Sequence, residues 1–391
     1  MKRLRVLSLA TLYPNDLTPN FGIFVERQMQ AVARRGDVDL VLVNPIGLPP
    51  FPLSLHPRYR RLAGLPKEEQ RGGIRVLRPR FRLLPGIGGR FNAQAVARAV
   101  LPLARRLHAE APFDLVDAQF FYPDGPAAVE IARALGLPSS IKARGADIHH
   151  WGKAPGVAGQ VLKAGRQASG LLAVAQGLAD DMAALGMDRA KITIHRTGLN
   201  ADLFRPYDGA MCRDELGLPR DAPVLACVGA LIPRKGQRFA IDAMPLLPEA
   251  ILLLAGTGPD EAALKSQAER LGVADRVRFL GAVPHDRLPI VLNAADVFVL
   301  PTASEGLANA WVEALACGTP VVTTPIPGAT ELLTDPAWGA FAARDKLAIA
   351  IEVSQMLERR PPRETVAATV AGFSWKANAA ALVDYWRGLA G

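Results

Sequence analysis

Residues 296–322 read DVFVLPTASEGLANAWVEALACGTPVV and contain two glutamates, Glu305 and Glu313. The apolar run Asp296–Pro301 ends at a proline, which predicts a buried β-strand. We then expect Glu305 in the loop after that strand and Glu313 on a helix that begins just beyond it. Parallel α/β sheets bind ligands at the edge formed by the carboxyl ends of their strands, where the N-terminus of a helix favours anions. Acidic side chains beside an anion site indicate a ligand that also offers hydroxyl groups.

A nucleoside-diphosphate sugar has both kinds of group. Its diphosphate can bind helix amides, and its sugar and ribose hydroxyls can donate hydrogen bonds to carboxylates. The segment resembles the Glu-x7-Glu motif of the family 4 retaining glycosyltransferases, which have the GT-B fold. Gly306 and the continuation Cys317–Val322 make the resemblance more specific. Two glutamates at this spacing alone are also compatible with solvated acids at the start of a helix.

The chain has 391 residues, half of them apolar, which is enough for two domains with large cores. Strand-like and helix-like segments alternate in two successive sets, which predicts an α/β fold with two doubly wound parallel sheets. The resemblance implies GT-B, with two Rossmann-like domains and an interdomain cleft. We expect an acceptor-side domain at 1–205, a nucleotide-sugar-binding domain at 206–373, and a C-terminal helix at 374–391 that crosses back to the first domain. The expected strands are 4–10, 38–43, 115–119, 139–142, 171–175, 224–229, 251–255, 277–280, 297–300 and 321–323.

Two cations follow the strand that opens the second half. Arg234 and Lys235 lie between Gly229 and Gly236, so both side chains can reach a ligand at the end of that strand. Such cations bind diphosphate through charge-assisted hydrogen bonds and stabilise the charge that develops on a leaving group. The spacing is close to the family pattern Gly-x5-Lys-Gly, so we assign Arg234, Lys235 and Glu305 to catalysis. A Lys-Gly turn that merely ends a strand is the alternative.

Glycines at strand ends are expected to let a donor approach the backbone. Gly256 and Gly258 follow one expected strand, Gly281 ends the next, and Gly22 precedes a helix in the first half. Ordinary turn chemistry is the alternative for each of them. The donor contacts that the resemblance implies are Gly22, Gly229, Gly256, Gly258, Gly281, Gly306, Leu307 and Glu313.

A stretch of the first half carries the expected acceptor side. Residues 142–149 resemble the His-Gly-x-Asp segment of many relatives, but Arg144 stands where those have histidine. An arginine cannot act as a general base at neutral pH, so any role of Arg144 must be electrostatic. Asp147 is the candidate acceptor-side carboxylate, and we also include it among the catalytic candidates.

The positive charge is concentrated in the first half, where residues 1–205 hold 29 Lys and Arg against 16 Asp and Glu. Residues 58–106 are the extreme, with 13 cations and only two acids, Glu68 and Glu69. No sequence signature of a nucleic-acid-binding motif accompanies them, so we expect no nucleic acid as a partner. We favour an anionic membrane surface or an anionic lipid-linked acceptor, and an arginine-rich solvated face is the alternative.

Scattered cysteines at 212, 227 and 317 indicate a reducing compartment and give no zinc-site pattern. The sequence shows no Asp-x-Asp motif in a suitable loop, so we expect no metal and no cofactor, the sugar nucleotide being a substrate. The N-terminal apolar run is short and is expected to form the first strand. We therefore expect a cytoplasmic protein, and hypothesise peripheral attachment to the inner face of the cytoplasmic membrane.

The interpretation that joins these features is a retaining glycosyltransferase, expected to be a hexosyltransferase. It would move a sugar from a nucleoside-diphosphate sugar to a glycan or lipid-linked glycan in cell-surface polysaccharide synthesis. One alternative is a sugar-nucleotide epimerase or hydrolase of the same fold. A non-catalytic polysaccharide- or nucleic-acid-binding protein is the other.

Overall fold

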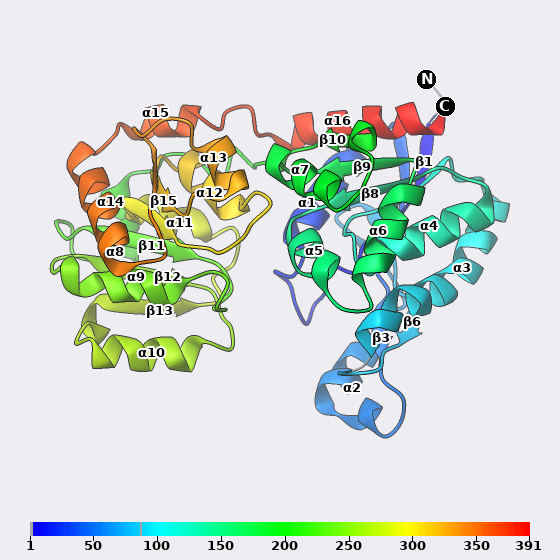
Figure 1. Cartoon of the computed structure of the whole chain (residues 1–391), viewed down its shortest axis with the longest axis horizontal. Coiled ribbons are helices and arrows are strands. Elements are labelled where there is room, and N and C mark those ends of the chain that lie inside the picture. The colour runs from blue at the N-terminus through cyan, green and yellow to red at the C-terminus, as the bar shows by residue number, and fades with distance from the viewer. Residues whose placement is uncertain (1–2, 87) are drawn as a thin grey trace. The chain divides into compact units, whose positions relative to one another are not determined.

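The computed structural model describes residues 3–86 and 88–391, which divide into two compact units. The first unit ends at Gly198 and includes the C-terminal stretch Trp375–Gly391, whereas the second is Leu199–Ser374. Each unit contains a predominantly parallel β-sheet whose strands are joined by helices (Figure 1). The predicted α/β class is confirmed.

In the described part of the first unit, eight strands form one sheet in the order β10-β9-β8-β7-β1-β2-β5-β4. Neighbouring strands are parallel except for β4 and β5. The central strands are covered on both faces, which explains why they read as nearly continuous apolar runs. The strands are β1 (Leu4–Leu9), β2 (Val38–Val43), β4 (Glu68–Arg71), β5 (Ile74–Leu77), β7 (Leu115–Ala118), β8 (Ser139–Ala143), β9 (Gly170–Ala173) and β10 (Ile192–Ile194).

Helices fill the connections of this unit, the longest being α3. A separate pair of short parallel strands, β3 (Ile46–Leu48) and β6 (Arg80–Arg82), supports a small extension that carries α2. The α-helices are α1 (Ile23–Ala33), α2 (Pro57–Ala63), α3 (Asn92–Glu110), α4 (Asp124–Leu135), α5 (Ala146–His149), α6 (Ala158–Gln167), α7 (Gln176–Ala184) and α16 (Trp375–Ala390).

The antiparallel pair β4–β5 corrects the expectation of a purely parallel sheet. Arg71 pairs with Ile74, so the two strands are joined by Gly72 and Gly73 alone. Both glycines have positive φ, 58° and 83°, as a tight two-residue hairpin turn requires. β4 is polar and lies at the sheet edge, so its sequence lacks the apolar run from which the other strands are predicted.

In the second unit, all of whose residues are described, six parallel strands follow the order β13-β12-β11-β14-β15-β16. The strands are β11 (Val224–Val228), β12 (Ile251–Ala255), β13 (Val277–Gly281), β14 (Val297–Leu300), β15 (Val321–Thr323) and β16 (Gly339–Phe341). The α-helices are α8 (Gly209–Glu215), α9 (Gln237–Ala243), α10 (Glu261–Arg270), α11 (Leu288–Ala294), α12 (Asn309–Ala316), α13 (Pro327–Leu332), α14 (Lys346–Arg359) and α15 (Arg363–Ala368).

The second unit begins at Leu199, earlier than the expected boundary at 206. The reason is local packing, because the Phe204 ring lies against His285 with centroids 5.0 Å apart. Asn293 fixes the next turn, since its side-chain oxygen accepts a hydrogen bond from the Tyr207 backbone at 2.8 Å.

Helix α16 packs into the core of the first unit. Trp386 has no exposed surface, and its indole N–H donates to Asp117 Oδ1 at 3.2 Å. At the same helix, Arg387 forms an ion pair with Asp37 at 2.7 Å. A large buried aromatic ring thus holds this helix against β7, and an ion pair holds it to the residue before β2; both partners lie more than 200 residues earlier in the chain.

Candidate active site

The candidate site of the second unit lies where the strand order reverses. The chain runs from β11 outward through β12 and β13, then returns to β14 on the other side of β11. In doubly wound sheets, ligands bind beyond the carboxyl ends of the strands at such a switch point. Lys235 follows β11, and Glu305 follows β14, so the two predicted site residues come from the loops on either side of this switch.

Glu305 is held by both predicted cations. Its Oε1 lies 2.6 Å from Arg234 Nη1 and 2.7 Å from Lys235 Nζ. Thr302 Oγ1 also donates to Oε1, at 3.3 Å. Burial raises the pKa of Glu305, but the charges of Lys235 and Arg234 outweigh that effect, so its pKa is lowered and the carboxylate stays ionised. The structure therefore brings these three residues together.

Glycines let the neighbouring backbones meet at this edge of the sheet. A Cβ on Gly256 would lie 2.0 Å from the Gly229 carbonyl oxygen, and one on Gly258 would lie 2.2 Å from the Leu231 oxygen. Gly229 and Gly256 both have φ of 152°, a conformation that side chains rarely adopt. Gly281 ends β13, where its carbonyl accepts a hydrogen bond from the Gly256 N–H. Gly229, Gly256, Gly258 and Gly281 thus lie in loops whose backbones contact one another at the ends of β11, β12 and β13.

Glu313 has a partner that the sequence analysis does not identify. The carboxylate is 4% exposed and lies on α12, and its Oε1 is 2.7 Å from Nε2 of His285. His285 lies in the loop between β13 and α11, and its ring contacts that of Phe204 at an interplanar angle of 58°. A single histidine in a loop has no motif around it, so only the fold shows this pairing.

The loop from Glu305 to α12 is closely packed. Gly306 and Leu307 are buried, and a Cβ on Gly328 would lie 1.9 Å from the Gly306 carbonyl oxygen. The segment that follows β15 therefore contacts the loop at Gly306 and Leu307 directly, and only glycine at position 328 allows the two backbones to come this close.

In the first unit, Gly22 occupies the start of α1 with a φ of 77°. A Cβ there would lie 2.5 Å from the carbonyl carbon and oxygen of Leu12, in the loop after β1. The glycine thus allows the N-terminus of α1 to touch the loop that follows the first strand.

Arg144 is fixed by two glutamines. Its Nη2 donates to Gln28 Oε1 at 3.0 Å and to Gln119 Oε1 at 2.7 Å, and its Nε donates to the Gln119 carbonyl at 2.8 Å. Burial lowers the pKa of Arg144 to about 10, which leaves the guanidinium charged at neutral pH. The glutamines come from α1 and from the end of β7, and no spacing in the sequence links them to Arg144.

Asp147 is placed differently from the acceptor-side role expected for it. The residue has no exposed surface, and its carboxylate accepts hydrogen bonds from the backbone N–H groups of Arg144, Gly145 and Phe121 at 2.8–3.1 Å. Burial raises its pKa, against the effect of these donors. The Asp147 carboxylate therefore fixes the backbone of the loop at Arg144 and Gly145. It has no exposed surface that could contact an acceptor.

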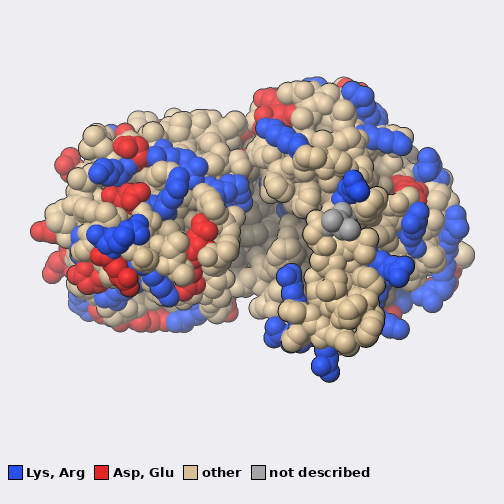
Figure 2. Space-filling model, turned by 60° about the horizontal axis from the view of Figure 1, so that its bottom comes forward, with Lys and Arg blue, Asp and Glu red and all other residues tan. Residues whose placement is uncertain are grey.

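The charge asymmetry between the two halves is visible on the molecular surface. In the view of Figure 2, the charged atoms of the first unit are mostly blue, with a few red patches, whereas the second unit shows both signs in similar measure. Part of the basic segment 58–106 is nevertheless used inside the fold. Arg71 pairs with Glu26 at 2.6 Å, and Arg78, whose side chain has no exposed surface, pairs with Glu69 at 2.7 Å.

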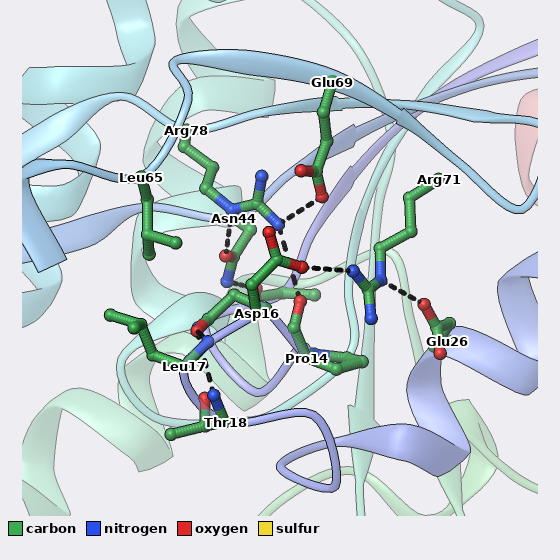
Figure 3. A network of polar contacts seen from close by, with 12 residues as sticks. Pro14, Asp16, Leu17, Thr18, Glu26, Asn44, Leu65, Glu69, Arg71 and Arg78 are labelled. Atoms are coloured by element: carbon green, nitrogen blue, oxygen red, sulfur yellow. Dashed lines mark hydrogen bonds and ion pairs between the residues drawn. The ribbon is translucent and has the colours of Figure 1, made fainter. Parts of the chain in front are cut away.

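Figure 3 shows how Arg71 and Arg78 hold separate segments together. Arg71 also reaches Asp16 at 3.2 Å, and Arg78 donates to Asn44 Oδ1 at 3.2 Å. Arg78, which directly follows β5, also donates to the Pro14 carbonyl in the loop after β1, and its buried side chain is not available to a ligand. Arg71 and Arg78 are thus internally paired, so only other cations of the segment are free to form a basic surface.

Solved structures establish the class of fold. A sucrose-phosphate synthase of Thermosynechococcus elongatus aligns over 99% of each chain with a TM-score of 0.81 and 20% identity. HepE of Anabaena, solved in complex with UDP and glucose, aligns over 99% of this chain and 100% of its own, with a TM-score of 0.75 and 19% identity. The fold is that of the GT-B glycosyltransferases.

Family models assign the chain more specifically. Residues 22–198 match a glycosyl transferase 4-like domain, and residues 212–372 match the glycosyl transferases group 1 model. The chain belongs to the group 1 glycosyltransferase family and is an enzyme of that class.

Curated relatives agree with this family. A Bacillus subtilis protein named as a teichuronic acid biosynthesis glycosyltransferase, TuaC, is 29% identical over 340 residues, which is 84% of this chain and 83% of that relative. Several mycobacterial relatives align over only about half of their own length.

No helix in the described ranges 3–86 and 88–391 is both long and apolar enough to cross a membrane.

Proposed function

We propose that this enzyme is a retaining glycosyltransferase that moves a hexose from a nucleoside-diphosphate sugar to a glycan or lipid-linked glycan. The observation that carries the proposal is the convergence of Arg234 and Lys235 on Glu305 at the switch point of the second sheet. Two cations share a single carboxylate there, so the cluster has a surplus positive charge. A diphosphate is the substrate group that this charge fits.

The two cations would act most strongly on the leaving group. As the bond between the sugar and the diphosphate breaks, negative charge grows on the phosphate oxygens. Lys235 Nζ and the remaining N–H groups of Arg234 would stabilise that charge, at roughly 1.5–3 kcal/mol for each charge-assisted hydrogen bond. Interactions that strengthen as charge develops lower the barrier, whereas those made equally with the substrate do not. The departing phosphate would help to deprotonate the acceptor hydroxyl on the same face, with no metal or cofactor.

The two glutamates would have separate tasks. Glu305 lies beside the cations and would accept hydrogen bonds from hydroxyl groups of the reacting sugar. Glu313 lies on α12, where the contact with His285 fixes its orientation. Its carboxylate would accept hydrogen bonds from the ribose hydroxyls. HepE, a structural neighbour, was solved with UDP and with UDP-glucose, which supports a sugar nucleotide as the donor.

Arg144 would serve the acceptor. Its guanidinium is charged and fixed by Gln28 and Gln119, so it suits an anionic group such as a phosphate or an acidic sugar. The relative TuaC is named for teichuronic acid biosynthesis, which supports a role in cell-surface polysaccharide synthesis. We propose a cytoplasmic location with peripheral attachment to the inner face of the membrane, because the exposed arginines of the first unit would attract anionic lipid.

The decisive experiment measures transfer and release of nucleoside diphosphate by the purified chain. UDP-, GDP- and ADP-sugars are supplied with and without a glycan or lipid-linked acceptor, and the anomeric configuration of the product is determined by NMR. Retention of configuration with acceptor-dependent release supports the proposal. Isomerised donor without transfer would instead identify an epimerase, and release that is unaffected by any acceptor would identify a hydrolase.

A further inference from the structure

The small extension of the first unit exposes three large apolar side chains that are close together in the sequence. It consists of β3, the 3-10 helix η1 (Leu53–Leu55), α2 and β6. Phe51, Leu53 and Leu55 are 78%, 53% and 59% exposed, and they lie within five consecutive residues. Scattered exposed apolar residues are ordinary, but a cluster of this kind marks an interaction site.

Cations border this cluster, and acids are absent from it. Arg58, Arg60 and Arg61 are exposed on α2, directly after the apolar residues. The sequence contains no Asp or Glu between Asp39 and Glu68. In Figure 1 α2 lies at the far end of the extension from the main sheet, and in Figure 2 this end comes forward as tan surface with blue atoms at its margin.

The extension is held in place despite its exposed tip. His56 caps α2 by accepting a hydrogen bond from the Arg58 N–H, and Pro57 occupies the first turn. Leu65, just after α2, is buried, and its carbonyl accepts a hydrogen bond from Arg80 on β6. The apolar side chains are therefore presented on a structured support.

We propose that the tip at residues 51–61 inserts into an anionic lipid bilayer. Phe51, Leu53 and Leu55 would enter the boundary between headgroups and acyl chains, while Arg58, Arg60 and Arg61 would bind the lipid phosphates. A bilayer is the partner that offers an apolar layer immediately beneath a layer of negative charge, which is the arrangement of this tip. The inference adds a specific membrane contact to the proposed function and does not depend on the chemistry of the second unit.

Vesicle co-sedimentation of the full chain tests this insertion. The variant Phe51→Ser/Leu53→Ser/Leu55→Ser should bind vesicles containing phosphatidylglycerol at least about tenfold more weakly than the wild type. The reason is that the variant loses the free energy of moving three apolar side chains from water into the bilayer. The matched control is Leu347→Ser/Ile351→Ser on α14, where the replaced side chains are 57% and 45% exposed. The control should bind as the wild type does, and thermal melting verifies that both variants fold.

A site-specific probe reports the insertion itself. The three native cysteines are buried, so Leu53→Cys provides a single accessible thiol for a polarity-sensitive fluorophore. Its emission should shift to the blue with phosphatidylglycerol vesicles, whereas a label at Leu347→Cys should not respond. Equal vesicle binding by the triple variant and wild type, no binding by the wild type, or an unshifted probe would overturn the proposal. Light scattering that shows a dimer broken by the triple variant would assign the tip to a second copy instead.

The proposed function is measured separately. Release of nucleoside diphosphate from the donor with a water-soluble acceptor should be unchanged in the triple variant. Loss of vesicle binding with intact release would support the insertion alone, whereas vesicle binding by a wild-type chain that acts on no sugar nucleotide would refute only the proposed function.

Discussion

Glu305 Oε1 lies 2.7 Å from Lys235 Nζ, although the two residues are separated by 70 positions and follow different strands of the second sheet. Arg234 contacts the same oxygen. One carboxylate and two cations thus form a compact cluster at the switch point. Its surplus positive charge and its place beyond the carboxyl ends of the strands favour binding of an anion.

Lys235→Ala is expected to reduce turnover by a factor on the order of 10²–10³, by analogy with the loss of one donor that stabilises transition-state charge. The measurement is the rate of nucleoside diphosphate release under saturating donor. Lys265→Ala, which removes an exposed cation that pairs with Glu261 at 2.7 Å, is the control and should retain normal turnover. Near-normal turnover in a folded Lys235→Ala enzyme would refute the assignment.

Glu305→Gln and Glu313→Gln should have different kinetic signatures. Glu313 would bind the ribose equally in the ground state and the transition state, so its loss should mainly raise KM for the donor. Glu305 lies beside the leaving-group cations, so its loss should mainly lower kcat. Steady-state kinetics with varied donor distinguish these cases, and identical changes in the two variants would show that this division of roles is wrong.

Asp147→Ala should destabilise the first unit, because three backbone N–H groups would lose their buried acceptor. The expected loss is about 2–4 kcal/mol in the free energy of unfolding. Chemical denaturation measures it, with Asp286→Ala as a control at an exposed position. A variant of unchanged stability whose acceptor kinetics collapse would return Asp147 to the acceptor-side role first expected of it.

Asp124 should make stability depend on pH. Burial, reinforced by Asp147 and Asp117, raises the pKa of this carboxyl to about 7. The folded state therefore holds the proton more tightly than the unfolded state, so this contribution is fully present below about pH 4 and is lost as pH rises towards 7. In Asp124→Asn the side-chain oxygen can still accept the Thr11 N–H, as Asp124 does at 2.9 Å.

The Asp124→Asn variant should consequently gain stability relative to the wild type as pH rises from 5 to 8, on the order of 1–3 kcal/mol. Urea denaturation of both proteins across this range provides the comparison. A stability difference that stays constant with pH would mean that Asp124 titrates as an ordinary exposed carboxyl.

Much of the architecture can be predicted from the sequence, because buried parallel strands such as β11, β12 and β14 are continuous apolar runs. The short or polar edge strands cannot be recognised in this way. β16 has only three residues, and β4 is charged, although the Gly72-Gly73 pair between β4 and β5 is a hairpin signal.

The candidate site could be predicted in part. Arg234, Lys235 and Glu305 lie in loops that directly follow strands, and the topology of a parallel sheet brings such loops to one edge. His285 beside Glu313, and Gln28 beside Arg144, could not be predicted, because these contacts depend on side-chain packing between segments without a shared spacing. Asp147 shows the converse, since a polar residue in a motif-like position proves to be fully buried.

Thermal-shift screening of the wild type and Lys235→Ala against UDP-, GDP- and ADP-sugars tests the central claim most directly. A donor at 100 times its dissociation constant should stabilise the wild type by about 2.7 kcal/mol, and the shift should shrink or vanish in Lys235→Ala. If no sugar nucleotide raises the Tm of the wild type, or if both proteins respond equally, the cluster of Glu305, Arg234 and Lys235 is not the donor site.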